Sequence, residues 1–225
     1  TWELATEPTF RALAQSGTLT TSEDRDFTVK VDVQNLSPTT TYYYRFKALR
    51  RTSPIGRTRT APSGAVVRLR FAVVSCSSFA HGYFHSYRTL ATELDLDAIL
   101  HLGDYIYEYA TGGYGNVREY EPENEIVTLA DYRMRHSLYK RDPDMQAVHQ
   151  QHPFITVWDN HETANDAYKD GAQNHEPHEG RRMGGTQTRR ATRIRRMDAD
   201  PRAGGRDTRL SQAQLRQSRR HRHAG

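Results

Sequence analysis

Residues 101–109, HLGDYIYEY, place three phenols around one aspartate directly after an apolar run. Asp104 follows a glycine, and Tyr105, Tyr107 and Tyr109 come after it at alternate positions. Carboxylate and phenolate oxygens are hard anionic ligands, so this stretch favours a metal site. The alternative, judged from these residues alone, is an ordinary hydrogen-bonded turn after a buried strand.

Two more polar stretches follow apolar runs elsewhere in the chain. Residues 66–76, VVRLRFAVVSC, end in the thiol of Cys76, and residues 154–160, FITVWDN, are followed by His161. With DAILHL at 97–102, these runs predict three buried strands of a sheet that is covered on both faces. Because parallel strands end at one edge of a sheet, we expect the three polar stretches to converge there.

The segments between these strands have helical periodicity. Residues 83–96 and 128–140 are predicted helices, and the second begins with Thr128 as N-cap and Asp131 at the third helical position. A further helix is predicted at 143–151, with proline in its first turn. Strands that alternate with helices indicate the α/β class with a largely parallel sheet.

Residues 1–61 have the period-two pattern of strands instead. Residues 27–33 alternate apolar and polar side chains, and residues 41–49 are rich in aromatic residues, so each predicts a strand. The stretch LSPTTTY, which ends at Tyr42, has the spacing of the tyrosine corner of immunoglobulin-like and fibronectin-like sandwiches. We therefore expect part of a β-sandwich, with an ordinary hairpin as the alternative, followed by a Pro- and Gly-containing linker at 59–66.

Composition divides the chain at about residue 180. Residues 181–225 contain 14 arginines and 3 acidic residues, whereas residues 1–180 carry a net charge of −6. The arginine-rich tail has almost no apolar periodicity, so we expect it to form no core. Cys76 is the only cysteine, which excludes an internal disulfide, and no apolar run is long enough for a membrane span. The chain starts at Thr1 without a signal peptide pattern, and we interpret Thr1 as the cut edge of a longer protein.

The motifs VVSCSS, LHLGDYIYEY and TVWDNHETAND resemble the alkaline phosphatase D (PhoD) family of calcineurin-like metallophosphoesterases. The upstream stretches LSPTTTYYYRFKA and SPIGRTRTAP resemble the small N-terminal domain that precedes the phosphatase in that family. The resemblance covers about residues 1–180. It implies a partial N-terminal domain at 1–61 and the first part of a metallophosphatase sandwich at 66–180.

The resemblance also implies metal ligands. Cys76 matches the thiolate ligand of a ferric ion, and Tyr107 matches its phenolate ligand. Asp104 matches the carboxylate that bridges Fe³⁺ to a second site, which holds Ca²⁺. Asn160 matches the asparagine of the second site, and Asn165 is an alternative that one sequence does not distinguish from it. These donor types suit the two ions, since thiolate and phenolate favour Fe³⁺ whereas carboxylate and amide oxygens favour Ca²⁺.

His161 matches the histidine that contacts phosphate and donates a proton. The implied activity is metal-dependent hydrolysis of phosphate monoesters and diesters by a secreted or periplasmic enzyme, with this chain an incomplete and weakly active fragment. The partner is a phosphate ester. The alternative function is a non-catalytic extracellular β-sandwich binding module, which would have no reason to hold iron.

The resemblance stops after NHEPHEG, at Gly180. The tail stretch RMDADPR, with suitable codons shifted by one nucleotide, encodes Glu-Trp-Met-Pro-Ile-Arg, a segment that the family has after this point. This favours the hypothesis that residues 181–225 are an out-of-frame, non-native tail. The alternative is an arginine-rich arm that binds nucleic acid non-specifically, although it lacks interleaved aromatic residues.

Overall fold

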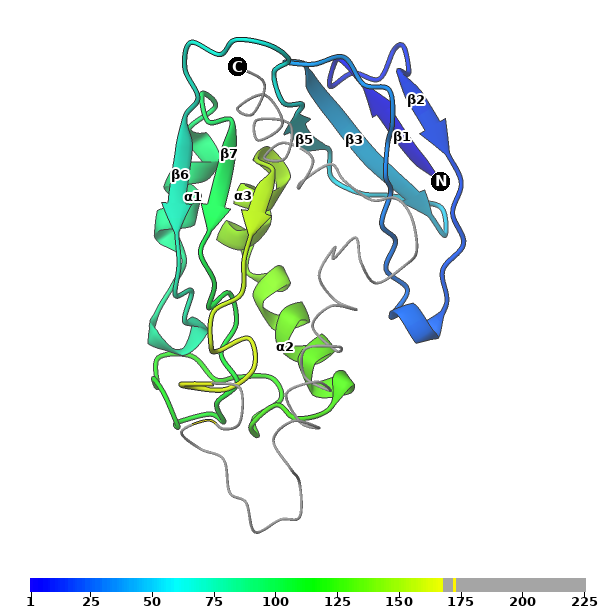
Figure 1. Cartoon of the computed structure of the whole chain (residues 1–225). Coiled ribbons are helices and arrows are strands. Elements are labelled where there is room, and N and C mark those ends of the chain that lie inside the picture. Colours follow the sequence, from blue (N-terminus) through cyan, green and yellow to red (C-terminus); the bar gives the residue numbers. More distant parts are fainter. Residues whose placement is uncertain (168–171, 173–225) are drawn as a thin grey trace, which may run out of the picture.

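The computed structural model describes residues 1–167 and residue 172. Its N-terminal part is a five-stranded antiparallel sheet. The strand order is β2-β1-β3-β4, and β5 pairs with β3 (Figure 1). The strands span Trp2–Ala5 (β1), Gln15–Gly17 (β2), Thr41–Ala48 (β3), Arg51–Thr52 (β4) and Gly56–Arg59 (β5). The strand predicted at 41–49 is therefore confirmed as β3.

Tyr42 confirms the tyrosine corner. Its hydroxyl accepts a hydrogen bond from the backbone N–H of Ser37 at 3.0 Å, which ties the start of β3 to the preceding turn. The ring is buried with Leu4 and Val33 in a small core. The hydrogen bond fixes the entry into β3, and the buried ring anchors the sheet to the segment that precedes it.

The strand predicted at 27–33 is wrong. The segment pairs with no neighbouring strand and follows a short 3₁₀ helix, η1, at Glu23–Arg25. Phe27 has a φ of 52° and a largely exposed side chain, so the alternation breaks at its first residue. Val31 and Val33 still pack against the small core. The described residues of 1–62 form one sheet, and the second sheet of a sandwich stays a prediction.

The second part of the chain contains the predicted parallel sheet, in the order β6-β7-β8. Val74 pairs with His101 and His101 pairs with Thr156, so the three strands end level with one another. The strands span Phe71–Val74 (β6), Ala98–His101 (β7) and Phe154–Thr156 (β8), and the helices span Phe79–His81 (η2, 3₁₀), His85–Thr92 (α1), Leu129–Arg141 (α2) and Pro143–Gln151 (α3). All three predicted strands and all three predicted helices are present.

The helix starts follow from local chemistry. The Thr128 hydroxyl accepts from the Asp131 N–H, and the Asp131 carboxylate accepts from the Thr128 N–H, which confirms the predicted capping box of α2. The Asp142 carboxylate caps α3, whose first residue is Pro143. Helix α1 is shorter than the helix predicted at 83–96, since it begins at His85 and ends at Thr92.

One face of the parallel sheet is covered by helices, contrary to the prediction that both faces are buried. Figure 1 shows α1 and α3 behind the three strands. Ala72 and Val74 pack against the main core on the covered side, whereas Phe71 and Val73 are 44% and 60% exposed. Among the described residues, nothing covers this second face of β6, so its apolar side chains are available for packing.

Strand β5 joins the two parts of the chain. The Arg57 guanidinium donates to the carbonyl oxygens of Gln151 and Leu94, and the Gln150 amide donates to the carbonyl of Ile55 at 2.7 Å. Arg59 forms an ion pair with Asp97 at 3.2 Å, directly before β7. These contacts hold the N-terminal sheet against the end of the parallel sheet that is opposite to the polar strand ends.

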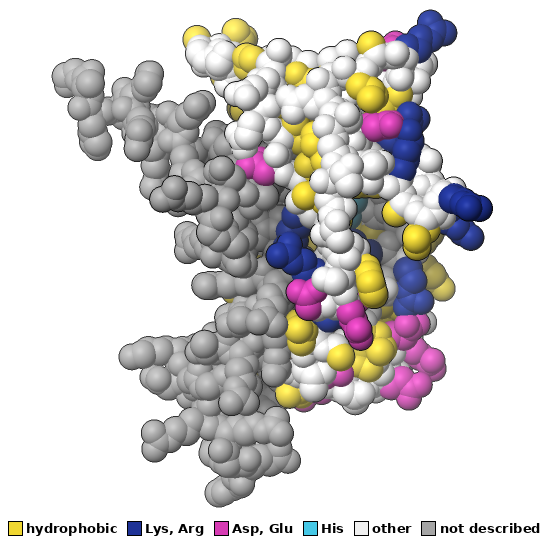
Figure 2. Space-filling model, turned by 90° about the vertical axis from the view of Figure 1, so that its right-hand side faces the viewer, with side chains coloured by type: hydrophobic (Ala, Val, Ile, Leu, Met, Phe, Trp, Pro, Cys, Tyr) yellow, Lys and Arg dark blue, Asp and Glu magenta, His cyan; other side chains and the backbone are white. Residues whose placement is uncertain are grey.

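Among the described residues, the helices are all too short or too polar to cross a bilayer. On the face shown in Figure 2, Lys and Arg side chains are spread among acidic and hydrophobic ones, and they form no single basic patch. The predicted tail at 181–225 lies outside the described residues.

Candidate metal site at the ends of the parallel strands

The polar stretches after β6 and β7 meet, as predicted from the parallel order. The Cys76 Sγ lies 3.6 Å from Oδ2 of Asp104. The backbones continue to pair beyond the strands: the Cys76 N–H donates to the Gly103 carbonyl at 3.2 Å, and the Ser77 N–H donates to the Asp104 carbonyl at 2.9 Å. The thiol and the carboxylate are therefore held together by the backbone and not only by their own contact.

Both of these residues have left-handed backbone conformations. Cys76 has a φ of 56° and Asp104 a φ of 55°, values that cost roughly 1–3 kcal/mol at a non-glycine residue. Between β7 and Asp104, Gly103 has a φ of 107°, and a Cβ there would lie 2.4 Å from the backbone nitrogen of Asp159. The glycine is therefore required for the close approach of the chain after β8, and strain of this kind is concentrated at functional sites.

Tyr107 lies beside this pair and is 3% exposed. Burial, followed by the negative charges of Asp104 and Cys76, raises the pKa of the Tyr107 phenol well above its usual value of 10. In the protein alone, burial and these neighbouring charges thus oppose ionisation of the Tyr107 phenol. A multivalent cation would reverse that effect, so the donor set fits the predicted ferric ligands.

The segment after β8 brings His161 to the same place. Its backbone N–H donates to Oδ1 of Asp104 at 3.1 Å, and its ring lies 4.3 Å from the Tyr107 ring, centroid to centroid. Nδ1 of His161 lies 2.8 Å from a carboxylate oxygen of Glu108. Burial lowers the pKa of His161, but the hydrogen bond and charge of Glu108, with the charges of Asp104 and Glu162, outweigh it and raise the pKa.

Sequence reasoning did not single out Glu108, although it belongs to the HLGDYIYEY stretch. Its side chain is buried, and its second oxygen accepts from the backbone N–H of Asn165 at 2.6 Å. The signal was present as one acid four residues after Asp104, but nothing in that spacing shows that it pairs with His161.

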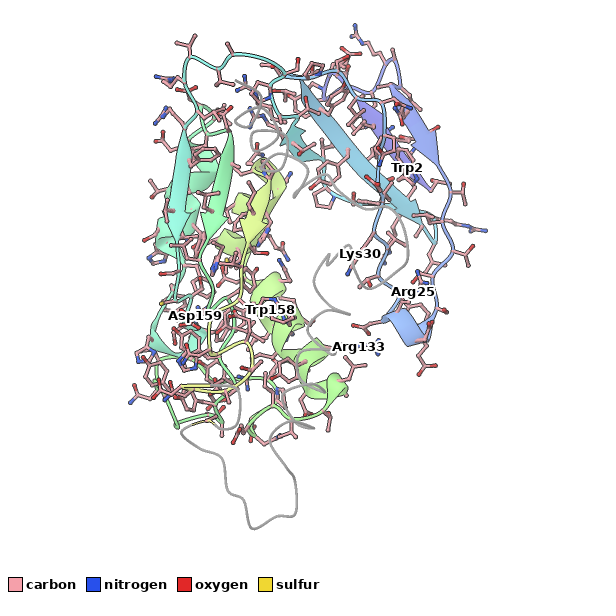
Figure 3. All side chains as sticks on the ribbon, in the orientation of Figure 1. Trp2, Arg25, Lys30, Arg133, Trp158 and Asp159 are labelled. Atoms are coloured by element: carbon pink, nitrogen blue, oxygen red, sulfur yellow. The ribbon has the colours of Figure 1, made fainter. Side chains whose placement is uncertain are left out.

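The two asparagines proposed for the second metal lie next to each other. Nδ2 of Asn160 is 3.2 Å from Oδ1 of Asn165, and the Glu108 carboxylate connects the Asn165 backbone to His161. Both residues are therefore near the site, and the choice between them stays a prediction. Figure 3 shows the start of this segment, Trp158 and Asp159, just beyond the parallel strands.

Glu162 is a second acid that the sequence analysis assigned no role. Its buried carboxylate accepts from the backbone N–H groups of Asp104 at 2.9 Å, Tyr105 at 2.5 Å and Asp159 at 2.8 Å. Burial raises the pKa of Glu162 to about 7, although the three N–H donors lower it. The residue connects the chain after β7 to the chain after β8.

Arg135 fixes the loop that carries Tyr107. The guanidinium is fully buried and donates to the carbonyl oxygens of Tyr107, Tyr109 and Pro122. It also lies over the Tyr120 ring, 4.0 Å from its centroid. Burial lowers the pKa of this guanidinium because it removes water from around the charge. The carbonyl dipoles and the Tyr120 ring take the place of that water.

His101, the last residue of β7, forms hydrogen bonds that stabilise the same strand ends. Nε2 lies 3.0 Å from Oγ of Ser77, which is 2.6 Å from the hydroxyl of Tyr87, and Nδ1 accepts from the Gly103 N–H at 3.3 Å. The ring is therefore neutral, with its proton on Nε2. Burial, followed by the charge of Lys140, lowers the pKa of His101 to about 4.

This pKa predicts acid sensitivity that depends on His101. The folded value is lower than the ordinary 6.5, so the stabilisation is complete above pH 6.5 and is lost as the pH falls towards 4, by up to about 3 kcal/mol. His101→Asn should destabilise the fold at pH 7.5, and this difference should shrink at pH 4.5 in denaturant titrations. The exposed His85→Asn is the control. A difference that stays constant with pH would contradict the prediction.

The site opens to solvent on the α1 side. A cleft of about 390 Å³ lies beside Cys76, which is itself exposed, and is lined by hydroxyl and aromatic side chains that include Ser75, Ser78 and Tyr83. Within residues 1–167, no three side chains of the types His, Cys, Asp and Glu gather as they would in a metal site. The candidate ligands are instead a mixed set of one thiol, one carboxylate, one phenol and amides.

Comparison with known proteins gives matches in both parts of the chain. The family model described as PhoD-like phosphatase matches residues 71–199, and the model of the PhoD-like phosphatase N-terminal domain matches residues 1–62. The first match continues to residue 199, so the prediction that the resemblance stops at Gly180 is wrong.

Alkaline phosphatase D of Bacillus subtilis (strain 168) is 41% identical over 170 residues, which is 73% of this chain and 29% of that protein. A solved structure titled "Structure of PhoD" has a TM-score of 0.78 and 35% identity, and the alignment covers 87% of this chain and 37% of that one. The chain thus spans about a third of the length of these relatives. Since sequence and fold agree over both parts, the chain belongs to the PhoD-like phosphatase family.

Proposed function

We propose that the parent activity of this chain is metal-dependent hydrolysis of phosphate monoesters and diesters. The observation that carries the proposal is the position of Asp104, whose two carboxylate oxygens lie at the Cys76 thiol and at the His161 backbone N–H. The Asp104 carboxylate thus lies between a thiol and the histidine that would donate a proton, at the carboxyl ends of parallel strands. This arrangement suits a metal-assisted displacement at phosphorus.

Cys76 and Tyr107 would hold Fe³⁺, and Asp104 would bridge it to Ca²⁺ together with Asn160 or Asn165. The cations would neutralise the phosphoryl oxygens and supply Lewis acid chemistry at phosphorus. Burial is the largest cause of the raised pKa of Tyr107, and the charges of Asp104 and Cys76 add to it. Bound positive charge would offset both effects, which supports this assignment.

His161 would donate a proton to the leaving oxygen of the ester. Its raised pKa keeps the imidazole protonated at higher pH than an ordinary histidine, and the Glu108 carboxylate at 2.8 Å orients the ring through Nδ1. This arrangement leaves Nε2 as the nitrogen that would face the substrate. Proton transfer by a positioned side chain contributes about 10²–10⁴-fold to a rate.

The substrate would be a phosphate ester. The protein would act outside the cytoplasm, as its resemblance to secreted or periplasmic phosphatases implies. The mixture of charges in Figure 2 supports no extended nucleic-acid surface on that face. A binding module without catalysis is less well supported, because such a protein has no use for strained Cys76 and Asp104 side by side.

The role of His161 is tested by leaving-group dependence in a chain whose reading frame is restored after Gly180. His161→Asn should lower turnover of an alkyl phosphate by about 10²–10⁴-fold, and that of p-nitrophenyl phosphate much less, because p-nitrophenolate leaves without a proton. His85→Asn, at an exposed helix start, is the control. Equal losses on both esters would show that His161 is not the proton donor.

A further inference from the structure

Glu162 makes contacts that its neighbours in the DNHE stretch do not. Oε2 accepts from the N–H groups of Asp104 at 2.9 Å and Asp159 at 2.8 Å, and Oε1 accepts from the Tyr105 N–H. The side chain is 3% exposed, so these donors take the place of water around the carboxylate. One acid thus holds backbone groups from two different strand ends.

The backbone that Glu162 holds is the strained part of the site. Asp104 has a φ of 55°, and its N–H and that of Tyr105 both point to this carboxylate. In this conformation the Asp104 side chain reaches the Cys76 Sγ with one oxygen and the His161 N–H with the other. Without an anchor, the chain would be free to relax to a more favourable φ, and both contacts of the carboxylate would change.

We propose that Glu162 is a positioning residue that fixes the Asp104 backbone, so that the Asp104 carboxylate lies between Cys76 and His161. The proposal rests on the proposed function, since it is Asp104 that would bridge the two metals. Glu162 itself would touch neither metal nor substrate. Its effect on metal binding would pass through the two N–H groups and the Asp104 side chain.

A carboxylate suits this task better than the amide of a glutamine. Three N–H groups converge on two oxygens, and both oxygens accept. Glutamine has one acceptor oxygen, and its NH₂ group would face a backbone N–H, donor against donor. Glu162→Gln therefore preserves side-chain size while it removes at least one of the anchoring hydrogen bonds.

The chain offers a matched control in Asp131, a carboxylate that also accepts from two backbone N–H groups, those of Val127 and Thr128. The experiment compares the full chain with its Glu162→Gln and Asp131→Asn variants. Amide hydrogen exchange is measured without metal, and affinity for Fe³⁺ is measured by competition with a chelator. Both N–H groups contact the same oxygen of Asp131, Oδ2, so the single carbonyl oxygen of an asparagine can still accept from both. Asp131→Asn should therefore leave exchange at Val127 and Thr128, and iron affinity, unchanged.

Glu162→Gln should speed exchange at Asp104 and Tyr105 and weaken iron affinity by about 10–100-fold, as loss of a ligand's hydrogen-bonding partner typically does. Equal iron affinity for the chain and Glu162→Gln would overturn the positioning role and leave the proposed function intact. Absence of iron binding by the unsubstituted chain would overturn the proposed function itself. Unchanged exchange at Asp104 and Tyr105, measured without metal, would overturn the positioning role independently of any metal.

Discussion

Replacing Cys76 with serine should remove bound Fe³⁺ and the visible charge-transfer band that thiolate or phenolate ligation produces. A serine hydroxyl does not ionise in the range where a thiol does, so the substitution removes an anionic donor of the same size. Cys76 is the only cysteine of the chain, and no other thiol can substitute for it. Iron content by elemental analysis and the absorption spectrum of the reconstituted protein measure the effect.

Tyr107→Phe should shift or weaken the same band with a smaller loss of iron, because it removes the phenol oxygen and keeps the buried ring. Tyr109→Phe is the matched control, since Tyr109 is a neighbouring phenol that we interpret as packing, in ring contact with Tyr114. Unchanged iron stoichiometry in Cys76→Ser would exclude Cys76 as a ligand. An unchanged band in Tyr107→Phe would exclude Tyr107.

On the hypothesis that residues 181–225 are out of frame, the 225-residue chain should hydrolyse phosphate esters at least about 100-fold more slowly than a chain read in the alternative frame after Gly180. That is a difference of about 2.7 kcal/mol in activation free energy. The described strand ends supply one thiol, one carboxylate, one phenol and amides as candidate ligands. Within residues 1–167, no three His, Cys, Asp or Glu side chains are arranged so that they could hold a metal ion. With so few ligands, the second metal would be held loosely. It would then provide little of the several kcal/mol of transition-state stabilisation that comes from clamping both reacting oxygens.

The measurement is turnover of p-nitrophenyl phosphate and bis-p-nitrophenyl phosphate by both proteins with added Fe³⁺ and Ca²⁺. The coding DNA gives an independent check, since the alternative frame beyond Gly180 should continue a phosphatase with further His and Asp motifs. Comparable turnover by the two proteins would show that residues 1–180 already contain a complete site. Stop codons in the alternative frame would exclude the frameshift.

The elements around the site could be predicted because their signals are local. The capping box of Thr128 and Asp131 and the proline at 143 depend on residues within one turn, and both helix starts were predicted correctly. The convergence of Cys76, Asp104 and His161 followed from one topological rule, that parallel strands share their carboxyl edge. The tyrosine corner at Tyr42 is likewise set within six residues.

The failures depend on contacts between distant segments. Residues 27–33 have the alternation of a strand, but a strand also needs a neighbour to pair with, and none lies beside them among the described residues. The run at 66–76 predicted a sheet buried on both faces, whereas Val73 is exposed because helices cover only the other face. Burial requires a partner layer that a strand's own sequence does not reveal.

The positioning residues were missed for a related reason. Glu108 and Glu162 are ordinary acids in the sequence, and their partners His161 and Asp104 lie more than fifty residues away along the chain. His101 reads as the end of an apolar strand, and only the fold shows its ring between Ser77 and Gly103. The ligand types could be proposed from sequence, whereas the hydrogen bonds that orient them required the fold.

Anomalous diffraction at the iron absorption edge, from crystals grown with Fe³⁺, tests the central claim most directly. The claim is that the ends of β6 and β7 build one metal site from a thiol, a carboxylate and a phenol. The account predicts a single strong peak within bonding distance of the Cys76 Sγ, an Asp104 carboxylate oxygen and the Tyr107 hydroxyl. A peak found only elsewhere, or no peak beside Cys76 in iron-loaded protein, would contradict it.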